Sequence, residues 1–247
     1  MKKILIADKM SVEAEKVFNA NGIEYDKKIG LSEEEICNII NDYNGVIVRS
    51  ATKITKKIID NGKNLKVLGR AGIGVDNIDI DAATTKGIVV MNTPFGNSIT
   101  TAEHTISLMM SLARNIPQAS QSTKEGKWEK NIFMGTELFG KSLGMIGCGN
   151  IGSLVAERCI GLKMKVYVYD PFISDEQTEK IGAKKVELDF LLSSSDFITL
   201  HTPLNNETKG ILNKNTMKKC KQSVKIINCA RSHSENVKTF RNLSNSV

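Results

Sequence analysis

The chain has few aromatic residues, and it lacks a long hydrophobic run and a tract of one charge. Aromatic residues make up 5% of the 247 positions, which argues against a surface that stacks nucleic-acid bases. The net charge is +7, but the lysines are spread along the chain and form no basic run. No stretch approaches the roughly 20 apolar residues of a membrane span. We therefore expect neither nucleic acid nor a membrane as a partner.

The five cysteines are odd in number and include no C-x-x-C pair. This pattern predicts neither a disulfide framework nor a zinc site, and no other metal site is expected. Reduced thiols are typical of the cytoplasm. Only residues 4–7 are apolar before Asp8, which is too short for a signal peptide. The sequence therefore predicts a cytoplasmic protein.

Short runs rich in valine and isoleucine alternate with helical patterns along the chain. Strands that alternate with helices in this way predict an α/β fold with parallel sheets. The turn sequence 93–98 predicts a boundary between two domains, at 1–95 and 96–247. A helix near 99–114 is apolar over much of its circumference, which predicts burial or packing against another subunit. A polar stretch over 118–130 follows it, and a polar helix reaching Cys220 precedes the last strand pattern.

A G-x-G-x-x-G motif occupies 147–152, directly after a strand pattern and at the start of a helical one. Gly147 would make the tight turn, Gly149 would let the backbone approach a pyrophosphate, and Gly152 would let helix and strand pack closely. The uncapped helix N-terminus would then face the phosphates. The alternative is a glycine-rich turn in an α/β fold that binds no nucleotide.

An acidic residue follows the motif at the expected distance. Asp170 ends the next strand pattern, where dinucleotide-binding folds place a carboxylate about 20 residues beyond the glycines. A carboxylate there accepts hydrogen bonds from ribose hydroxyls and repels a 2′-phosphate. The sequence therefore favours NAD over NADP as cofactor.

Seven stretches together resemble the D-isomer-specific 2-hydroxyacid dehydrogenases. They are VRSATKIT (48–55), GRAGIGVDNID (69–79), NTPFGNS (92–98), GKW (126–128), the glycine motif, HTP (201–203) and NCAR (228–231). The resemblance implies two doubly wound parallel-sheet domains, a flavodoxin-like substrate domain and a Rossmann NAD domain. It implies oxidation of 3-phosphoglycerate to 3-phosphohydroxypyruvate in serine biosynthesis, or of a related D-2-hydroxy acid, by hydride transfer to NAD. It also implies a homo-oligomer, a dimer formed through the helix near 99–114.

The resemblance further implies roles for individual residues. Those that would contact NAD are Ile73, Gly147, Gly149, Asn150, Ile151, Gly152, Asp170, His201, Thr202, Pro203, Cys229, Ala230 and Arg231. Those that would face an anionic substrate are Arg49, Arg70, Ala71, Gly72 and Asn97. Arg231 would be the catalytic arginine that holds the substrate carboxylate and polarises the C2 oxygen. A guanidinium fork binds a carboxylate or phosphate bidentately; the alternative for Arg49 and Arg70 is a surface salt bridge.

The sequence departs from the family after Arg231. The family's proton-accepting histidine and its glutamate partner lie beyond this position, and 232–247 shows neither the pair nor a strand or helix pattern. We expect an incomplete NAD domain, truncated or frame-shifted after Arg231, with 224–230 as an aggregation-prone sheet edge. His104, His201 and His233 are candidate proton acceptors, but none has an identifiable carboxylate partner. The alternative function is a non-catalytic remnant that at most binds NAD.

Overall fold

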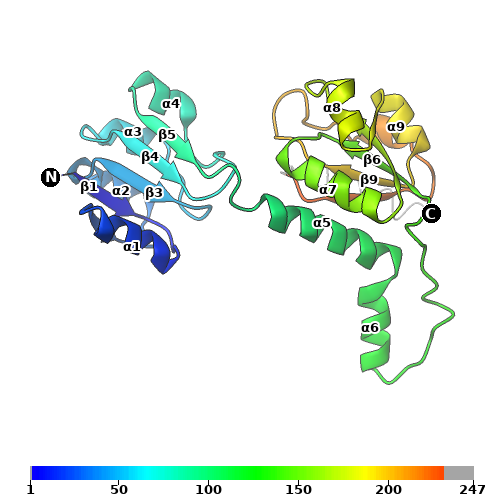
Figure 1. Ribbon diagram of the computed structural model, residues 1–247. Coiled ribbons are helices and arrows are strands. Elements are labelled where there is room, and N and C mark those ends of the chain that lie inside the picture. The colour runs from blue at the N-terminus through cyan, green and yellow to red at the C-terminus, as the bar shows by residue number, and fades with distance from the viewer. Residues whose placement is uncertain (1, 231–247) are drawn as a thin grey trace. The chain divides into compact units, whose positions relative to one another are not determined.

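The computed structural model describes residues 2–230, and the chain divides into two compact units, Met1–Asn97 and Ser98–Val247. Each unit contains one five-stranded sheet whose paired strands all run parallel (Figure 1). Buried apolar runs form the central strands, and helices cover them, as parallel sheets require. The α/β class with two parallel-sheet units is confirmed.

The first unit follows a flavodoxin-like path. Its elements are β1 (Lys3–Ile6), α1 (Val12–Ala20), β2 (Glu24–Lys27), α2 (Glu33–Ile39), a 3₁₀ turn (Ile40–Asp42), β3 (Gly45–Val48), α3 (Lys56–Asn61), β4 (Val67–Arg70), α4 (Ile80–Thr85) and β5 (Val89–Asn92). The strand order is β2-β1-β3-β4-β5, so the order reverses between β1 and β3. Ligands of open α/β sheets bind where strands end beside such a reversal.

An apolar core of the first unit packs on one face of this sheet. Leu5, Val46 and Leu68 are buried in the strands, and Ile36 and Ile58 pack on them from α2 and α3. Both helices begin at a hydroxyl that accepts a backbone N–H, with a reciprocal capping box at α2. The packed helices hold the carboxyl ends of β1, β3 and β4 in place.

The second unit has Rossmann strand order. Its elements are α5 (Ser98–Ala113), α6 (Ile116–Lys124), β6 (Ser142–Ile146), α7 (Asn150–Gly161), β7 (Lys165–Tyr169), α8 (Asp175–Lys180), β8 (Lys184–Lys185), α9 (Leu188–Ser194), β9 (Phe197–Leu200), α10 (Lys214–Met217) and β10 (Lys225–Asn228). The order β10-β9-β6-β7-β8 places the reversal between β6 and β9. This is the Rossmann order, in which the first strand of the fold lies at the centre of the sheet.

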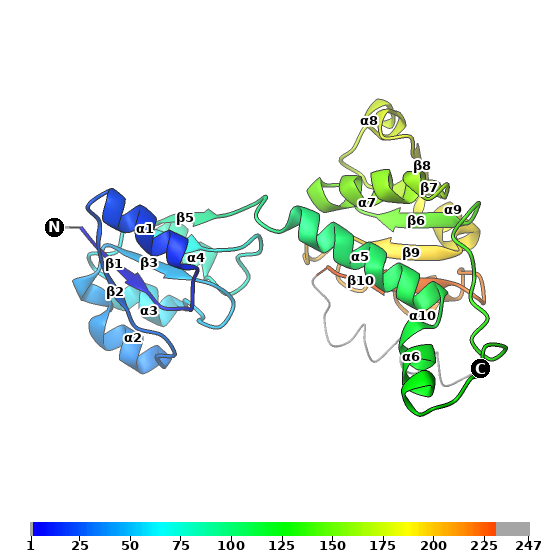
Figure 2. The ribbon, with the colours of Figure 1, turned by 60° about the horizontal axis from the view of Figure 1, so that its bottom comes forward.

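Two helices, α5 and α7, lie side by side over one face of the second sheet (Figure 2). Met109 of α5 and Val155 of α7 are fully buried there with Met145 of β6. The opposite face packs on α9 through Leu191 and Leu192. The glycine motif therefore stands at the end of a central strand that is covered on both sides.

Two helix predictions differ from the structure. α6 occupies part of the polar stretch where no helix was expected, because only Ser122 is buried on it and no apolar stripe marks it; Pro117 suits its first turn. The polar helix expected to reach Cys220 is only the short α10. Upstream, Asn205 Oδ1 accepts the N–H groups of Glu207 and Thr208, a local turn that competes with helix formation.

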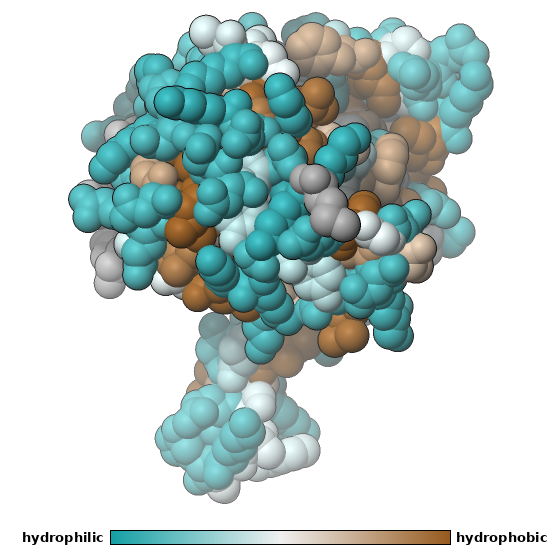
Figure 3. Space-filling view, turned by 90° about the vertical axis from the view of Figure 1, so that its left-hand side faces the viewer, coloured by the Kyte–Doolittle hydropathy of each residue, from teal (hydrophilic) through white to brown (hydrophobic). Residues whose placement is uncertain are grey.

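The surface is mostly hydrophilic on the face shown in Figure 3, with scattered apolar patches. Among the residues that the structure describes, no helix has both the length and the hydropathy needed to cross a bilayer.

Candidate functional site

The glycine motif forms the turn between β6 and α7, where the close approach of the protein's own backbone explains two of its glycines. Gly147 has φ +90°, and a Cβ there would lie 2.7 Å from the carbonyl oxygen of His201. A Cβ on Gly152 would lie 2.5 Å from the carbonyl oxygen of Gly147. Both distances are shorter than carbon and oxygen tolerate without movement, so the tight turn requires glycine at both positions.

Gly149 differs from the other two glycines. A Cβ on Gly149 would meet no atom within 4 Å, so this side of the turn is open. Gly149 is also the N-cap of α7, and no side chain caps the first N–H groups of that twelve-residue helix. The open space and the free N–H groups fit the pyrophosphate of a dinucleotide, which helix N-termini bind through such groups.

Asp170 follows β7 and lies against the glycine turn. Its Oδ2 accepts the backbone N–H of Cys148 at 2.8 Å, and its Oδ1 accepts the N–H of Phe172 at 2.8 Å. A carboxylate can accept about four hydrogen bonds, so each oxygen keeps the capacity to accept one from a ribose hydroxyl. Burial and the charge of Asp170 raise the pKa of the Cys148 thiol to about 11, so this thiol stays protonated at neutral pH.

The loop after β9 lies beside the glycine turn at the strand-order reversal. A Cβ on Gly147 would contact His201 and the methyl group of Thr202. The His201 ring is turned into its own strand, where Nε2 lies 3.0 Å from Thr199 Oγ1. Burial lowers the pKa of His201 to about 4, so the ring is neutral at neutral pH. His201 therefore shapes the turn with its backbone.

The remaining predicted cofactor residues of this unit lie nearby along the sheet edge. Asn150 and Ile151 form the first turn of α7. Cys229 and Ala230 follow β10, which pairs with β9, and the N–H of Ala230 is accepted by Asn228 Oδ1 at 3.0 Å. Arg231, His233 and the rest of the predicted tail lie outside the described residues.

In the first unit, two arginines emerge from adjacent strands. Val48 pairs with Arg70 in the β3–β4 register, and Arg49 follows Val48. Both side chains therefore leave the sheet at its carboxyl edge. Arg49 is exposed, so it is available to an anion. No ion pair is found for either arginine within residues 2–230, so the salt-bridge alternative finds no support there.

The Arg70 guanidinium lies over the backbone of Gly72. A Cβ at residue 72 would stand 1.4 Å from Arg70 Nη1, so a larger residue there would require the arginine side chain to move. Arg70 Nε is buried and has no hydrogen-bond partner among the described residues. The adjoining loop is held by Asn92, whose Nδ2 donates to the carbonyl of Ile73 at 2.7 Å. Asn97 is exposed at the end of this unit.

Three residues that the sequence analysis did not single out hold the Arg49 loop. They are Asp8, Thr52 and Asn77, which bond one another or the backbone of 49–52. Asp8 directly follows the first strand pattern, and a carboxylate at the end of a buried strand beside an order reversal is the signal that could have identified it.

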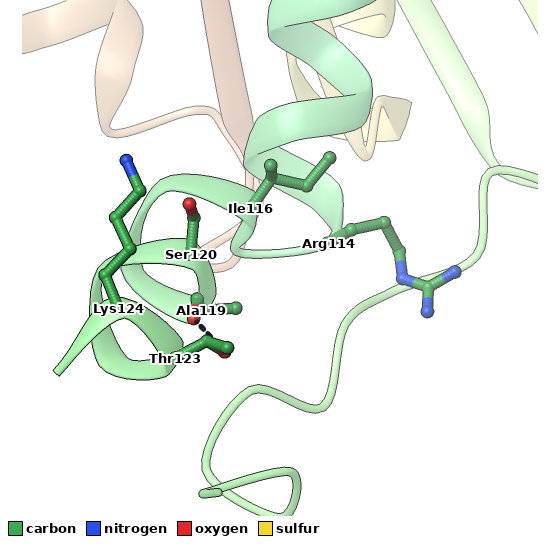
Figure 4. A pocket seen from close by; sticks show the side chains of 6 residues that line it. All are labelled: Arg114, Ile116, Ala119, Ser120, Thr123 and Lys124. Carbon is green, nitrogen blue, oxygen red and sulfur yellow. Dashed lines mark hydrogen bonds between the residues drawn. The ribbon is translucent and has the colours of Figure 1, made fainter. Parts of the chain in front are cut away.

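An open hollow of about 630 Å³ lies elsewhere, at the corner between α5 and α6 (Figure 4). Its lining residues are Arg114, Ile116, Ala119, Ser120, Thr123 and Lys124. None of the predicted site residues lines it, and the hollow holds no cluster of convergent acids and bases. The predicted site residues therefore lie at the sheet edges and not in this hollow.

Comparison with known proteins decides the family. Residues 106–240, more than half of the chain, match the family model "D-isomer specific 2-hydroxyacid dehydrogenase, NAD binding domain". The chain belongs to this family. The second unit, with its Rossmann order and glycine turn, thus carries the NAD-binding domain of a D-isomer specific 2-hydroxyacid dehydrogenase.

Individual relatives agree with this assignment. The D-3-phosphoglycerate dehydrogenase of Archaeoglobus fulgidus is 52% identical over 229 residues, which are 93% of this chain and 44% of that protein. The chain thus spans less than half the length of this curated relative. A D-lactate dehydrogenase from Aquifex aeolicus, solved with NAD and lactic acid, is 25% identical with a TM-score of 0.89, over 98% of this chain and 73% of that one.

A further solved structure shows that the fold does not by itself choose the cofactor. An acyclic imino acid reductase in complex with NADPH and D-Arg is 27% identical, with a TM-score of 0.86, over 99% of this chain and 79% of that one. The choice between NAD and NADP therefore rests with local groups and not with the fold.

Proposed function

We propose that this chain serves the NAD-dependent oxidation of 3-phosphoglycerate to 3-phosphohydroxypyruvate, the activity that the resemblance implies; curated relatives named D-3-phosphoglycerate dehydrogenase support the proposal. The observation that carries the proposal is the Asp170 carboxylate, which is bonded to the glycine turn and keeps one acceptor position free on each oxygen. Together with the open side at Gly149, this fits the ribose and pyrophosphate of NAD. The place of this reaction in serine biosynthesis, which the resemblance implies, is part of the same proposal.

In the proposed mechanism, each unit binds a different molecule. The NAD held by the second unit would supply the hydride acceptor for C2 of the hydroxy acid. The residues of the second unit orient the dinucleotide: the N–H groups at the start of α7 face the phosphates, and Asp170 accepts from the ribose. Asn150 and Ile151 belong to the same turn, Thr202 borders it, and Pro203, Cys229 and Ala230 follow the neighbouring strands β9 and β10.

The first unit supplies the anion-binding groups. We propose that Arg49 and Arg70 bind the phosphate and carboxylate of the substrate, with Ala71, Gly72, Ile73 and Asn97 beside them. Arg231 is proposed to hold the carboxylate and the C2 oxygen. A charged hydrogen bond contributes about 1.5–3 kcal/mol, so loss of one arginine weakens substrate binding roughly 10- to 100-fold.

A second candidate function, NAD binding without turnover, is favoured by the described histidines. His104 is exposed on α5, and His201 is neutral and bonded to Thr199. Within residues 2–230, neither forms an ion pair with a carboxylate that could prepare it to accept the C2 hydroxyl proton.

The absorbance of NADH tests the two candidates. Formation of NADH from 3-phosphoglycerate and NAD by the full chain, lost in Arg231→Ala, supports the dehydrogenase. NAD binding in calorimetry without turnover supports the second candidate. Arg49→Ala weakens 3-phosphoglycerate binding, whereas Lys63→Ala, which removes an exposed charge at the opposite edge of the same sheet, leaves it unchanged.

We also propose that the chain forms a homo-oligomer through α5. One face of this helix is buried against the second sheet, and Leu108 and Leu112, which flank that face, are 40% and 42% exposed. Trp128, beyond α6, is 83% exposed. Apolar side chains gathered on one segment are typical of a subunit interface. The cytoplasmic location stays a prediction.

A further inference from the structure

The loop that carries Arg49 is held by a buried carboxylate. Asp8, in the loop after β1, is 3% exposed. Its Oδ2 accepts the backbone N–H of Arg49 at 2.5 Å and that of Thr52 at 3.2 Å, and its Oδ1 accepts the Thr52 hydroxyl at 2.7 Å. Three donors from the loop thus converge on one side chain that lies more than 40 positions earlier in the chain.

The same loop is held from its carbonyl side. Asn77 Nδ2 donates to the carbonyl oxygen of Arg49 at 2.7 Å and to that of Thr52 at 2.6 Å. Both hydrogen bonds to the loop come from the amide nitrogen, and the amide oxygen Oδ1 is buried without a partner among the described residues. The amide cannot be reversed, since Oδ1 would then stand against two carbonyl oxygens.

The two sets of bonds fix both ends of the segment. Residue 49 and residue 52 each have their N–H bonded to Asp8 and their carbonyl bonded to Asn77. The side chains of Arg49, Ser50 and Ala51 remain exposed, while Thr52 is 8% exposed. The backbone is therefore rigid where the arginine side chain is free.

The charge of Asp8 does not by itself favour the binding of an anionic substrate. Asp8 lies at the order reversal of the first sheet, beside the arginine proposed to bind an anionic substrate, and a negative charge there repels that substrate. Burial by itself raises the pKa of Asp8, but the hydrogen bonds from Thr52 and from the Arg49 backbone bring the pKa below its ordinary value. Asp8 is therefore charged at neutral pH, and the hydrogen bonds that its carboxylate accepts hold the loop in place.

We propose that Asp8, Thr52 and Asn77 are positioning residues that hold the Arg49 guanidinium in place for the anionic substrate. The inference rests on the proposed function for the identity of that substrate. A displacement of about 1 Å in a group that holds the substrate lowers the reaction rate by up to about 100-fold. Loosening the loop thus weakens substrate binding without touching the substrate directly.

The test compares variants of the full chain by calorimetry with 3-phosphoglycerate and, separately, with NAD. Thr52→Val removes the hydroxyl at constant shape, Thr52→Ser keeps it, and Asp8→Asn removes the charge. We expect Thr52→Val and Asp8→Asn to weaken 3-phosphoglycerate binding about tenfold or more, with NAD affinity unchanged and Thr52→Ser close to the unmodified chain.

A stability control and a second readout separate positioning from folding. Tyr43→Phe removes a 2.6 Å hydrogen bond to Asp26 in the same unit, far along the sheet from the loop. If Thr52→Val and Asp8→Asn lose no more affinity than Tyr43→Phe, the inference is overturned. If the unmodified chain binds no 3-phosphoglycerate, the proposed function fails. Amide exchange at residues 49 and 52 then decides: faster exchange in Asp8→Asn supports the positioning role, and unchanged exchange overturns it.

Discussion

Replacing Asp170 separates the two tasks that the structure gives to this carboxylate. Its Oδ2 bonds the buried N–H of Cys148, and its remaining capacity is proposed for the ribose. Asp170→Asn keeps an oxygen for the N–H but removes the charge. Asp170→Ala removes both. The pair of variants therefore distinguishes support of the turn from recognition of the cofactor.

The magnitudes follow from the bonds that are lost. A charged hydrogen bond contributes about 1.5–3 kcal/mol, and a buried N–H left without an acceptor costs about 1–3 kcal/mol. We expect both variants to weaken NAD binding roughly 10- to 100-fold. Only Asp170→Ala adds a loss of about 1–3 kcal/mol in the free energy of unfolding. Both variants narrow the preference for NAD over NADP, because the repulsion of the 2′-phosphate is gone.

Calorimetry with NAD and NADP, together with urea unfolding, measures these effects. The matched control is Asp175→Asn, the same charge change on an exposed side chain in the first turn of α8 of the same unit. An Asp170→Ala variant that binds NAD as tightly as the unmodified chain would refute the role of this carboxylate in the cofactor site.

Three further outcomes are expected. Gly152→Ala destabilises the chain by about 1–3 kcal/mol in urea unfolding, because its Cβ meets a carbonyl at 2.5 Å; Gly149→Ala, with no atom within 4 Å, keeps stability but weakens NAD binding. Burial by itself raises the pKa of Asp196, but hydrogen bonds from Lys221 and the Ser142 backbone outweigh it and lower the pKa from 3.8 to about 2. The folded state thus gains stability above pH 3.8 and loses about 2 kcal/mol as pH falls toward 2; unfolding of Asp196→Asn lacks this pH dependence. Lysine at Leu108 and Leu112 shifts the chain to a smaller species in light scattering; an unchanged mass contradicts the proposed interface.

The parts of the fold that depend on nearby residues were predictable from the sequence. Alternating strand and helix patterns predicted parallel sheets, and the glycine motif was recognisable because strand, turn and helix follow one another within a few residues. The polar helix α6 was not predictable, because a helix without an apolar stripe shows no helical periodicity in its sequence.

Contacts between distant segments escaped prediction for a different reason. Asp8 and Thr52 meet only because β1 and β3 pair in a particular register, and one sequence does not determine that register. The orientation of His201 likewise depends on burial, which turns its ring toward Thr199. The roles of Arg49, Arg70 and Arg231 stay predictions.

The glycine turn shows which positions of a G-x-G-x-x-G motif report on function. Gly147 and Gly152 face the protein's own backbone, so any descendant of this fold keeps them for packing even after its cofactor is lost. A Cβ on Gly149 would contact no neighbour in the chain, and the free acceptor positions of Asp170 are proposed for the cofactor alone. A relative that no longer binds a dinucleotide would therefore be recognised by substitutions at Gly149 and Asp170, and not by loss of the whole motif.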